Sequence, residues 1–313
     1  MMGGVSAPPA EPPPTELTWR PATPVPLGLT LAPLQRGPGD PTHQIAPDGA
    51  FWRTARTASG PATLRLSASR AGIRAAAWGP GRDLMLQQVP ALLGAHDDIA
   101  GFEPQHAVIR STWRRHAHLR LTSTGLVFEQ LVPAVLEQRV TGKEARASFR
   151  RLVRRYGEPA PGPTPGGMRV PPPPDVWRRI PSWEWHRANV DPGRARTVIA
   201  AAEVAHRLEE SLTLPRERRL ARLRAIPGVG RWTAAEVAQR AWGDPDELSV
   251  GDFHLPALVG WALVGRPVDD DEMLELLAPY LGHRHRAARM VELSGVGKPS
   301  FGPRMPVGDI RAI

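Results

Sequence analysis

A hairpin between two predicted helices constrains the fold more than any other feature of this chain. The stretch from Arg216 to Ala262 has helical patterns on both sides of Pro227-Gly228-Val229-Gly230, and the second helix is expected to start near Arg231. Both glycines permit positive φ angles and let backbone amides approach another molecule closely. The free amides of Gly228, Gly230 and Arg231 then face whatever lies before the helix, and a DNA phosphate fits them without any reading of bases. An ordinary corner between two helices is the alternative.

The composition favours a polyanionic partner. The 313 residues carry a net charge of +9, with a pI near 11.1, and clustered cations gain affinity for nucleic acid by releasing counterions from phosphates. Lys143 and Lys298 are the two lysines among the basic residues, an arginine bias that a GC-rich coding sequence explains equally well. With no cysteine, the chain has no disulfide, zinc knuckle or cysteine-ligated iron–sulfur cluster.

The chain also lacks the apolar run of about 18 residues that would cross a membrane. Its first residues, MMGGVSAPPAEPPPTE, have neither the basic nor the apolar part of a signal peptide. A cytoplasmic protein is therefore expected.

Periodicity and composition predict a mixed fold in four parts. Residues 1–15 are proline-rich and are expected to be a disordered tail, and residues 299–313 a loose C-terminal tail. Residues 16–118 are expected to form a small α+β domain, an antiparallel sheet with helices. Residues 119–298 are expected to form an all-α core, because the apolar period changes from that of a strand to that of a helix.

Within the first domain, strand-like runs begin at Leu27, Phe51, Ala62 and Ile73, and clusters such as GPGDP and SGPA separate them. Two helices, at 82–93 and about 104–115, are expected to cover a face of this sheet. In the core, helices are expected from 128, at 143–156 and at 194–212. Pro133 should kink its helix or mark the first turn, Asp175 should cap a short helix, and the proline-rich stretch between 157 and 174 should be a linker or crossing loop.

Three segments together resemble the helix-hairpin-helix DNA glycosylase superfamily. The most specific is LRAIPGVGRWTAAEVAQRAWG followed by SVGDFHLP, which is similar to the family's hairpin with an Asp about twenty residues further on. FEQLVPAVLEQRVT and, more weakly, APYLGHRHRAARM are similar to segments of its alkylation-repair branch, the 3-methyladenine DNA glycosylases II. The resemblance covers roughly residues 17 to 295, and it implies that the core forms two helical lobes after a β-rich domain.

In this resemblance Asp252 matches the catalytic aspartate. Breaking an N-glycosidic bond develops oxocarbenium character on the sugar, and a carboxylate stabilises that cation and can activate the attacking water. A base that alkylation has made cationic leaves without being protonated, so one acid suffices. The alternative role for Asp252 is to cap the helix predicted at 253–264, and both roles can hold together.

Trp232 discriminates between reaction classes. The resemblance places Trp232 where glycosylases with lyase activity carry a lysine that attacks the sugar, so a monofunctional, water-using enzyme is expected. Trp232 is then expected to line the base pocket, with a core position as the alternative. Trp183 and Trp185 are candidates for further pocket rings, although a buried structural role suits them better, and Trp185 is retained as a pocket residue. In the family's pocket-tryptophan segment this chain has Leu281, Gly282 and His283 instead.

The resemblance also implies residues that bind DNA. The hairpin residues expected to contact DNA are Gly228, Val229, Gly230, Arg231 and Thr233. The wedge that fills the space left by a flipped nucleotide is expected to be Gln138 or Arg139. A monovalent cation, K⁺ or Na⁺, held by the carbonyls of Arg224, Ile226 and Val229 is implied too. The pairs His116/His118 and His283/His285 have no third ligand nearby and are expected to face DNA or solvent.

The predicted function is therefore a bacterial DNA N-glycosylase of base-excision repair that acts on damaged, in the first place alkylated, bases in double-stranded DNA. It is expected to be monomeric, to need no cofactor apart from that cation, and to work at the nucleoid. Two alternatives remain: a non-catalytic DNA-binding protein that keeps the hairpin, and a glycosylase for deaminated or oxidised bases.

Overall fold

A computed structural model describes residues 13–297 and 308–309. Most of the predicted N-terminal tail and most of the predicted C-terminal tail lie outside the described residues. Thr15, placed in the tail from the sequence, instead begins the first strand. None of the described helices is both long and apolar enough to cross a membrane.

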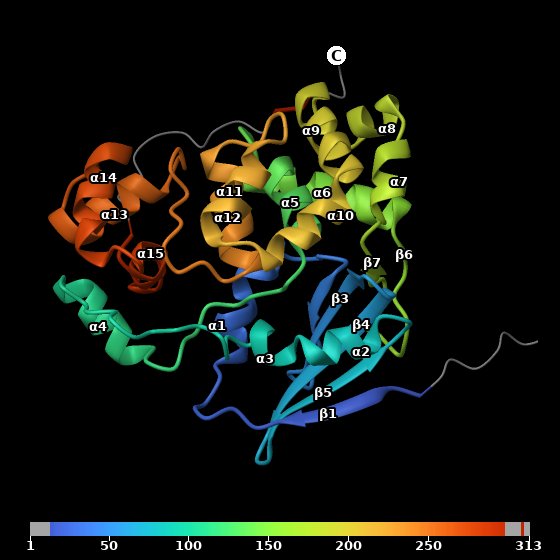
Figure 1. The fold of residues 1–313 in the computed structure, drawn as a ribbon, viewed down its shortest axis with the longest axis horizontal. Coiled ribbons are helices and arrows are strands. Elements are labelled where there is room, and N and C mark those ends of the chain that lie inside the picture. The colour runs from blue at the N-terminus through green and yellow to red at the C-terminus, as the bar shows by residue number, and fades with distance from the viewer. Residues whose placement is uncertain (1–12, 298–307, 310–313) are drawn as a thin grey trace, which may run out of the picture.

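The N-terminal part is built on a five-stranded antiparallel sheet in the order β1-β5-β4-β3-β2 (Figure 1). Its strands are β1 Thr15–Trp19, β2 His43–Ile45, β3 Phe51–Thr57, β4 Gly60–Ser69 and β5 Gly72–Trp78. The strands predicted from Phe51, Ala62 and Ile73 are confirmed. The strand predicted at Leu27 is wrong, because Leu27–Leu31 is helix α1, followed by the 3-10 turn Ala32–Leu34. Leu27, Leu31 and Leu34 are all buried, at the i, i+4, i+7 spacing of a helix.

Both faces of this sheet are covered. Helices α2 (Arg82–Gln87) and α3 (Val89–Leu92) share one apolar core with the sheet, as predicted for 82–93. On the other face Trp52 and Trp78 of the sheet stack with ring centroids 5.4 Å apart, and Met168 packs in the same cluster. The predicted linker thus packs on the sheet, and its short strands β6 (Glu158–Pro159) and β7 (Arg169–Val170) pair with each other.

The helix predicted at 104–115 does not cover the sheet. It is α4, Ala107–Arg115, and it packs against α15 (Arg284–Leu293) at the far side of the molecule (Figure 1). Ile109 and Leu119 lie in the same core cluster as the C-terminal helices. Arg286 forms an ion pair with Asp97, and the side chains of both residues are almost completely buried. Residues 97–119 therefore belong to the C-terminal packing unit.

The first helical lobe surrounds one large core and contains the hairpin. Its helices are α5 Val127–Leu136, α6 Gly142–Tyr156, α7 Pro174–Arg179, α8 Ser182–Arg187, α9 Pro192–Glu203, α10 Ala205–Glu210 with the 3-10 turn Ser211–Thr213, α11 Arg216–Arg224 and α12 Arg231–Ala241. Pro133 lies well inside α5, not in its first turn. Asp175 lies inside α7, whose N-cap is Pro173, and pairs with Arg179 one turn later. The long helix predicted at 194–212 is divided at Val204.

The second lobe is smaller and holds the C-terminal helices. It contains α13 (Leu255–Val264), α14 (Asp270–Leu277) with the 3-10 turn Ala278–Tyr280, and α15. These helices form a separate group beside α11 and α12 in Figure 1. The mixed fold class, a β-rich part followed by two helical lobes, is confirmed.

Candidate active site

The hairpin needs its first glycine for two reasons. Gly228 has a φ of +87°, and a Cβ atom there would lie 2.0 Å from Oγ1 of Thr197 on α9. Gly230 differs, because its φ is −90° and nothing would lie within 4 Å of a Cβ atom. The prediction that both glycines serve positive φ angles is therefore wrong for Gly230. Its missing side chain instead leaves open space in front of α12.

The N-terminus of α12 presents backbone donors to this open space. Gly230 is its N-cap and supplies no side-chain cap, and the amide of Ala234 is the first to bond back along the helix, to the Gly230 carbonyl at 3.0 Å. The amides before Ala234 therefore have no intrahelical acceptor, which suits a helix end that meets an anion. Val229 is 5% exposed, so its side chain belongs to the core and only its backbone is available to a ligand.

The loop after α5 contacts the hairpin directly. Nε2 of Gln138 donates to the Gly228 carbonyl at 2.9 Å and to Oγ1 of Thr233 at 2.8 Å. Thr233 is buried, and its hydroxyl bonds to Gln138 instead of facing solvent. Arg139 is exposed and has a φ of +54°, a backbone conformation that residues other than glycine rarely adopt. Of the two predicted wedge residues, Gln138 is engaged by the hairpin and Arg139 stands at the tip of the loop.

Asp252 is held by bonds to both of its carboxylate oxygens. Oδ1 accepts from the backbone amides of His254 at 2.7 Å and Leu255 at 2.8 Å, which are the amides at the start of α13. Oδ2 accepts from Nε1 of Trp232 at 3.1 Å. The helix starts at Leu255 with His254 as its N-cap, two residues later than predicted, but Asp252 still accepts from the amides at this helix start. These bonds fix the direction in which the second oxygen points.

Trp232 and Asp252 come together from different segments, in the one site that the resemblance implies. Trp232 lies in the first turn of α12, is half-buried, and lines the same groove as Asp252. It therefore stands at the surface of the site, and the alternative of a core aromatic at the hairpin is wrong. The indole N–H makes Trp232 a partner of the carboxylate as well as a wall of the groove.

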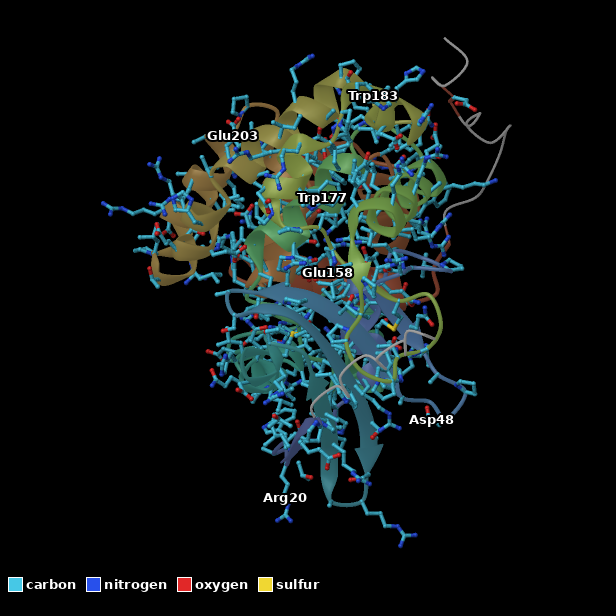
Figure 2. The ribbon with its side chains drawn as sticks, turned by 90° about the vertical axis from the view of Figure 1, so that its right-hand side faces the viewer. Arg20, Asp48, Glu158, Trp177, Trp183 and Glu203 are labelled. Carbon is cyan, nitrogen blue, oxygen red and sulfur yellow. The ribbon has the colours of Figure 1, made fainter. Side chains whose placement is uncertain are left out.

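The other predicted pocket tryptophan is not in the site. Trp185 is 2% exposed and stacks on Trp177 in the core of the first lobe, with ring centroids 5.8 Å apart. Trp185 lies on the inward face of the short helix α8, and burial of its ring there places it in the core. Trp183 on the same helix is 61% exposed and points away from the molecule at the end opposite the sheet (Figure 2). Neither ring replaces the missing pocket tryptophan.

Two connected spaces meet at Asp252. An open groove of about 1440 Å³ runs between the loop after α5, the hairpin and the loop before α13. A smaller cavity of about 190 Å³ lies behind it, between α1, α12, α13 and α15. Asp252 and His254 line both spaces. The cavity is roughly ten times larger than the space that one water molecule needs, so it can hold a larger group.

The groove contains further surface residues that no motif indicates. Arg196 is exposed on α9 and Phe253, beside Asp252, is 78% exposed. Arg194 is buried and donates to the Leu136 carbonyl at 2.7 Å, which ties α9 to the end of α5. Basic side chains and an exposed ring thus extend the surface that the hairpin begins.

The cavity is lined by residues that the sequence motifs do not identify. Glu236, Gln239 and Arg240 follow Trp232 by one and two turns of α12, and this helical spacing is a signal that could have found them. Oε2 of Glu236 accepts from Arg240 at 2.8 Å, and its Oε1 accepts from Oγ of Ser249 at 2.5 Å. The remaining polar walls come from distant segments: Thr30, Arg120, Thr122, His285, Arg289 and Glu292.

His285 corrects the prediction that the histidine pairs face DNA or solvent. It is 9% exposed and lines the cavity. Burial lowers the pKa of His285 well below its ordinary value, and the charges of Arg289, Arg240 and Arg286 lower it further. The imidazole is therefore neutral near pH 7. Within residues 13–297 and 308–309, no cluster of three His, Asp or Glu side chains suits a metal ion.

Comparison with known proteins agrees with this architecture. The 3-methyladenine DNA glycosylase from Archaeoglobus fulgidus superposes with a TM-score of 0.71 over 90% of this chain and 98% of its own, at 15% identity. The chain has the helix-hairpin-helix DNA glycosylase fold. MBOgg1 in complex with a low-affinity DNA ligand shares this glycosylase fold, with a TM-score of 0.66 over 91% of this chain and 96% of its own, at 13% identity.

A curated relative supports the alkylation-repair branch. The probable bifunctional transcriptional activator/DNA repair enzyme AlkA of Mycobacterium tuberculosis is 36% identical over 136 residues, which is 41% of this chain. The matched region spans 25% of the length of that relative. No family model matches the chain. The resemblance to glycosylases of the alkylation-repair branch, predicted from the three segments, is confirmed.

Proposed function

We propose that the protein is a monofunctional DNA N-glycosylase that hydrolyses the bond between a damaged base and its deoxyribose. The observation that carries this proposal is the position of Asp252 where the groove and the cavity meet. A duplex in the groove would place a flipped-out nucleotide with its sugar beside this carboxylate and its base in the cavity. The hairpin amides and the exposed arginines would hold the phosphates.

The carboxylate is arranged for this reaction. As the bond from C1′ to the base nitrogen breaks, the electron pair leaves with the base and the sugar gains oxocarbenium character. Oδ2 of Asp252 would stabilise that positive charge, since Oδ1 is occupied by two amides of α13. A water molecule then adds to C1′, and its proton passes to the carboxylate and finally to the released base. Trp232 would keep Oδ2 pointed at the sugar.

Water is the proposed nucleophile because no lysine is placed to act instead. Lys143 on α6 is not among the residues that line the groove, although its neighbour Gly142 is, and Lys298 lies outside the described residues. The position that carries the attacking lysine in lyases holds Trp232 in the resemblance. A duplex with a damaged base should therefore leave an intact abasic strand, and borohydride should trap no covalent complex. A trapped complex would contradict the monofunctional mechanism.

The proposed substrate is double-stranded DNA with an alkylated base, because the M. tuberculosis relative is described as a DNA repair enzyme and the confirmed resemblance is to the alkylation-repair branch. The deciding experiment is identification of the bases that a monomeric preparation releases from methylated and deaminated duplexes. Release of at least one base supports the proposal. Retention of every base together with tight DNA binding would favour the non-catalytic alternative.

Binding should weaken steeply with salt, because phosphate contacts release counterions. A fluorescence anisotropy titration from 50 to 200 mM salt measures this slope, with an uncharged polymer as control. An affinity that does not change with salt would contradict DNA as the partner.

A monovalent cation at the hairpin stays a prediction with a compatible geometry. The Ile226 carbonyl accepts one amide bond, from Val229 at 3.0 Å, and keeps its second lone pair. The carbonyls of Arg224 and Val229 accept no hydrogen bond from a loop or turn amide within the described part of the chain. K⁺ held there would stabilise the turn next to the phosphate. Exchange of K⁺ for tetramethylammonium at constant ionic strength should then weaken DNA binding.

A further inference from the structure

The walls of the cavity behind Asp252 differ from those that suit a cationic base. A cation is stabilised by the faces of aromatic rings. The aromatic rings among the lining residues, all within the described range 13–297, are the imidazoles of His254 and His285. Trp232 lines the groove but not this cavity. Three guanidinium side chains, from Arg120, Arg240 and Arg289, line it instead.

The acidic groups of the cavity are already paired. Glu236 accepts from Arg240 and from Ser249, so both of its oxygens are engaged. Glu292 forms an ion pair with Arg289. The carboxylates therefore offer little attraction to an added cation beyond what the arginines already use.

His285 and Thr30 are polar groups of the cavity that are left for a ligand. His285 is 9% exposed, and its imidazole has no hydrogen-bond partner within the described part of the chain. Its ring nitrogens are therefore free to bond to a ligand in the cavity, and Oγ1 of Thr30 is in addition a buried atom without a partner within the described residues. A ligand that bonds to these groups gains affinity. Since the imidazole is neutral, it can donate from one nitrogen and accept at the other.

The arginines around His285 show what charge this end of the cavity favours. Arg289, Arg240 and Arg286 all oppose a second positive charge at the imidazole. Arg240 and Arg289 are paired with Glu236 and Glu292, whereas Arg120 donates to the carbonyls of Ala117 and Leu119 and forms no ion pair within the described residues. The positive charge of Arg120 on this wall opposes a cationic base and favours carbonyl oxygens or a developing negative charge.

We propose that this cavity accepts an electrically neutral base with ring carbonyl groups, that His285 recognises this base by hydrogen bonding, and that cationic N-alkylated bases are disfavoured. The proposal rests on the proposed glycosylase function and narrows its substrate class. Neutral deaminated bases satisfy it, and so do alkylated bases that remain uncharged.

The way in which a neutral base leaves the sugar agrees with the residues that line the cavity. A neutral base takes both electrons of the C1′–N bond and is an anion until it gains the proton released by the attacking water. A cationic base becomes neutral in the same step and needs no such help. Guanidinium groups and the His285 N–H beside the leaving base would stabilise the anion, which is where positive groups lower the barrier.

Hypoxanthine and 7-methylguanine make a matched test, because both are 6-oxopurines but only the second is cationic in DNA. Single-turnover release of each base from otherwise identical duplexes is measured and divided by its spontaneous release. We expect the larger enhancement for hypoxanthine. A larger enhancement for 7-methylguanine would overturn the proposal while leaving the glycosylase function intact. Release of neither base would count against both proposals, and the two failures are thereby distinguished.

Variants of the cavity then test the residues. H285F should reduce hypoxanthine release about tenfold more than 7-methylguanine release, because only hypoxanthine leaves as an anion that the His285 N–H stabilises, and tenfold is about the value of one hydrogen bond. H285N, which keeps a donor and an acceptor, should restore part of the difference. H206F, at an exposed histidine of α10 outside the groove and the cavity, is the matched control.

Arg289 gives a second test that does not depend on the folding of H285F. R289M should shift the ratio of the two rates toward 7-methylguanine, whereas R289K keeps the positive charge and should preserve the ratio. Melting temperatures of all variants verify the fold. A rate ratio that stays unchanged in both H285F and R289M would overturn the proposed role of the cavity.

Discussion

The groove and the cavity meet at one carboxylate but are built from different parts of the chain. The groove is lined by four segments, 137–142, 191–200, 227–233 and 250–254, and the backbone of the hairpin and the loop after α5 meet in it. The cavity relies on side chains from five separate segments, including Thr30 and Arg289. A phosphate grip made of amides is common to any duplex, whereas side-chain walls set which base fits. Binding and selectivity should therefore respond to different substitutions.

The largest effect is expected from D252N. An asparagine can still accept the amides of His254 and Leu255 through its oxygen, so α13 stays capped. The negative charge beside the sugar is lost, and base release should fall about 100- to 1,000-fold in single-turnover assays. DNA affinity should stay within about twofold. D252A also removes the bonds to the amides of α13. If D252N and D252A lose base release and stability to the same extent, Asp252 has a structural role only.

The second effect concerns the scaffold that carries the groove. The carboxylate of Glu209 accepts from the amides of Val127 and Phe128 at the start of α5, and burial raises its pKa to about 7. A raised carboxyl pKa means that the folded state binds more protons than the unfolded state between about pH 4.5 and 7. The free energy of unfolding should fall as pH rises through this window, by up to about 3 kcal/mol.

E209Q should flatten this pH dependence, because the amide does not titrate. Urea unfolding followed by circular dichroism between pH 4.5 and 8 measures it, with E210Q at the exposed neighbour as control. If E209Q and the wild-type protein show the same slope, Glu209 does not titrate as described.

The third effect separates the two glycines of the hairpin. G228A meets both a positive φ and the hydroxyl of Thr197, and it should reduce the free energy of unfolding by about 1–3 kcal/mol. G230A has neither problem and should change stability by less than about 0.5 kcal/mol, while its methyl group obstructs the phosphate. Thermal unfolding and DNA anisotropy together measure this. Equal destabilisation by both substitutions would contradict the assigned geometry.

The smallest effect is expected from W232F. It keeps a ring in the groove and removes only the indole N–H that bonds to Asp252. Release should slow roughly 3- to 10-fold with little change in DNA affinity. A 100-fold loss would mean that the ring itself, and not the hydrogen bond, carries the contribution of Trp232.

Sequence reasoning succeeded where function depends on local backbone pattern. The hairpin and the start of α12 at Arg231 follow from glycine placement along one stretch. The resemblance placed Trp232 and Asp252 in one site, but the hydrogen bond between them was not predicted. The sheet strands with long alternating patterns were also predictable. At Leu27 the short run Leu-Gly-Leu-Thr-Leu fits both periods, and burial of Leu34 one turn later decided for a helix.

Side-chain positions that depend on packing between distant segments were not predictable. Trp185 could not be assigned to the core from its own helix, because its stacking partner Trp177 lies on α7. The cavity could not be found either, since His285 and Thr30 lie 255 residues apart in the sequence and meet only in the folded chain. For α4 the amphipathic pattern was recognised, but the surface that it covers was not.

The contact between the early segment 97–119 and α15 has a consequence for biosynthesis. Asp97 and Arg286 are 189 residues apart in the chain, and their ion pair is buried. During synthesis the residues of the sheet and of the first lobe are made before those of α15, which supplies one wall of the cavity. Contacts between segments so far apart in the sequence form more slowly than local contacts, so the apolar face of α4 stays uncovered until α15 reaches it. We therefore expect the hairpin to form before the cavity behind Asp252 is closed.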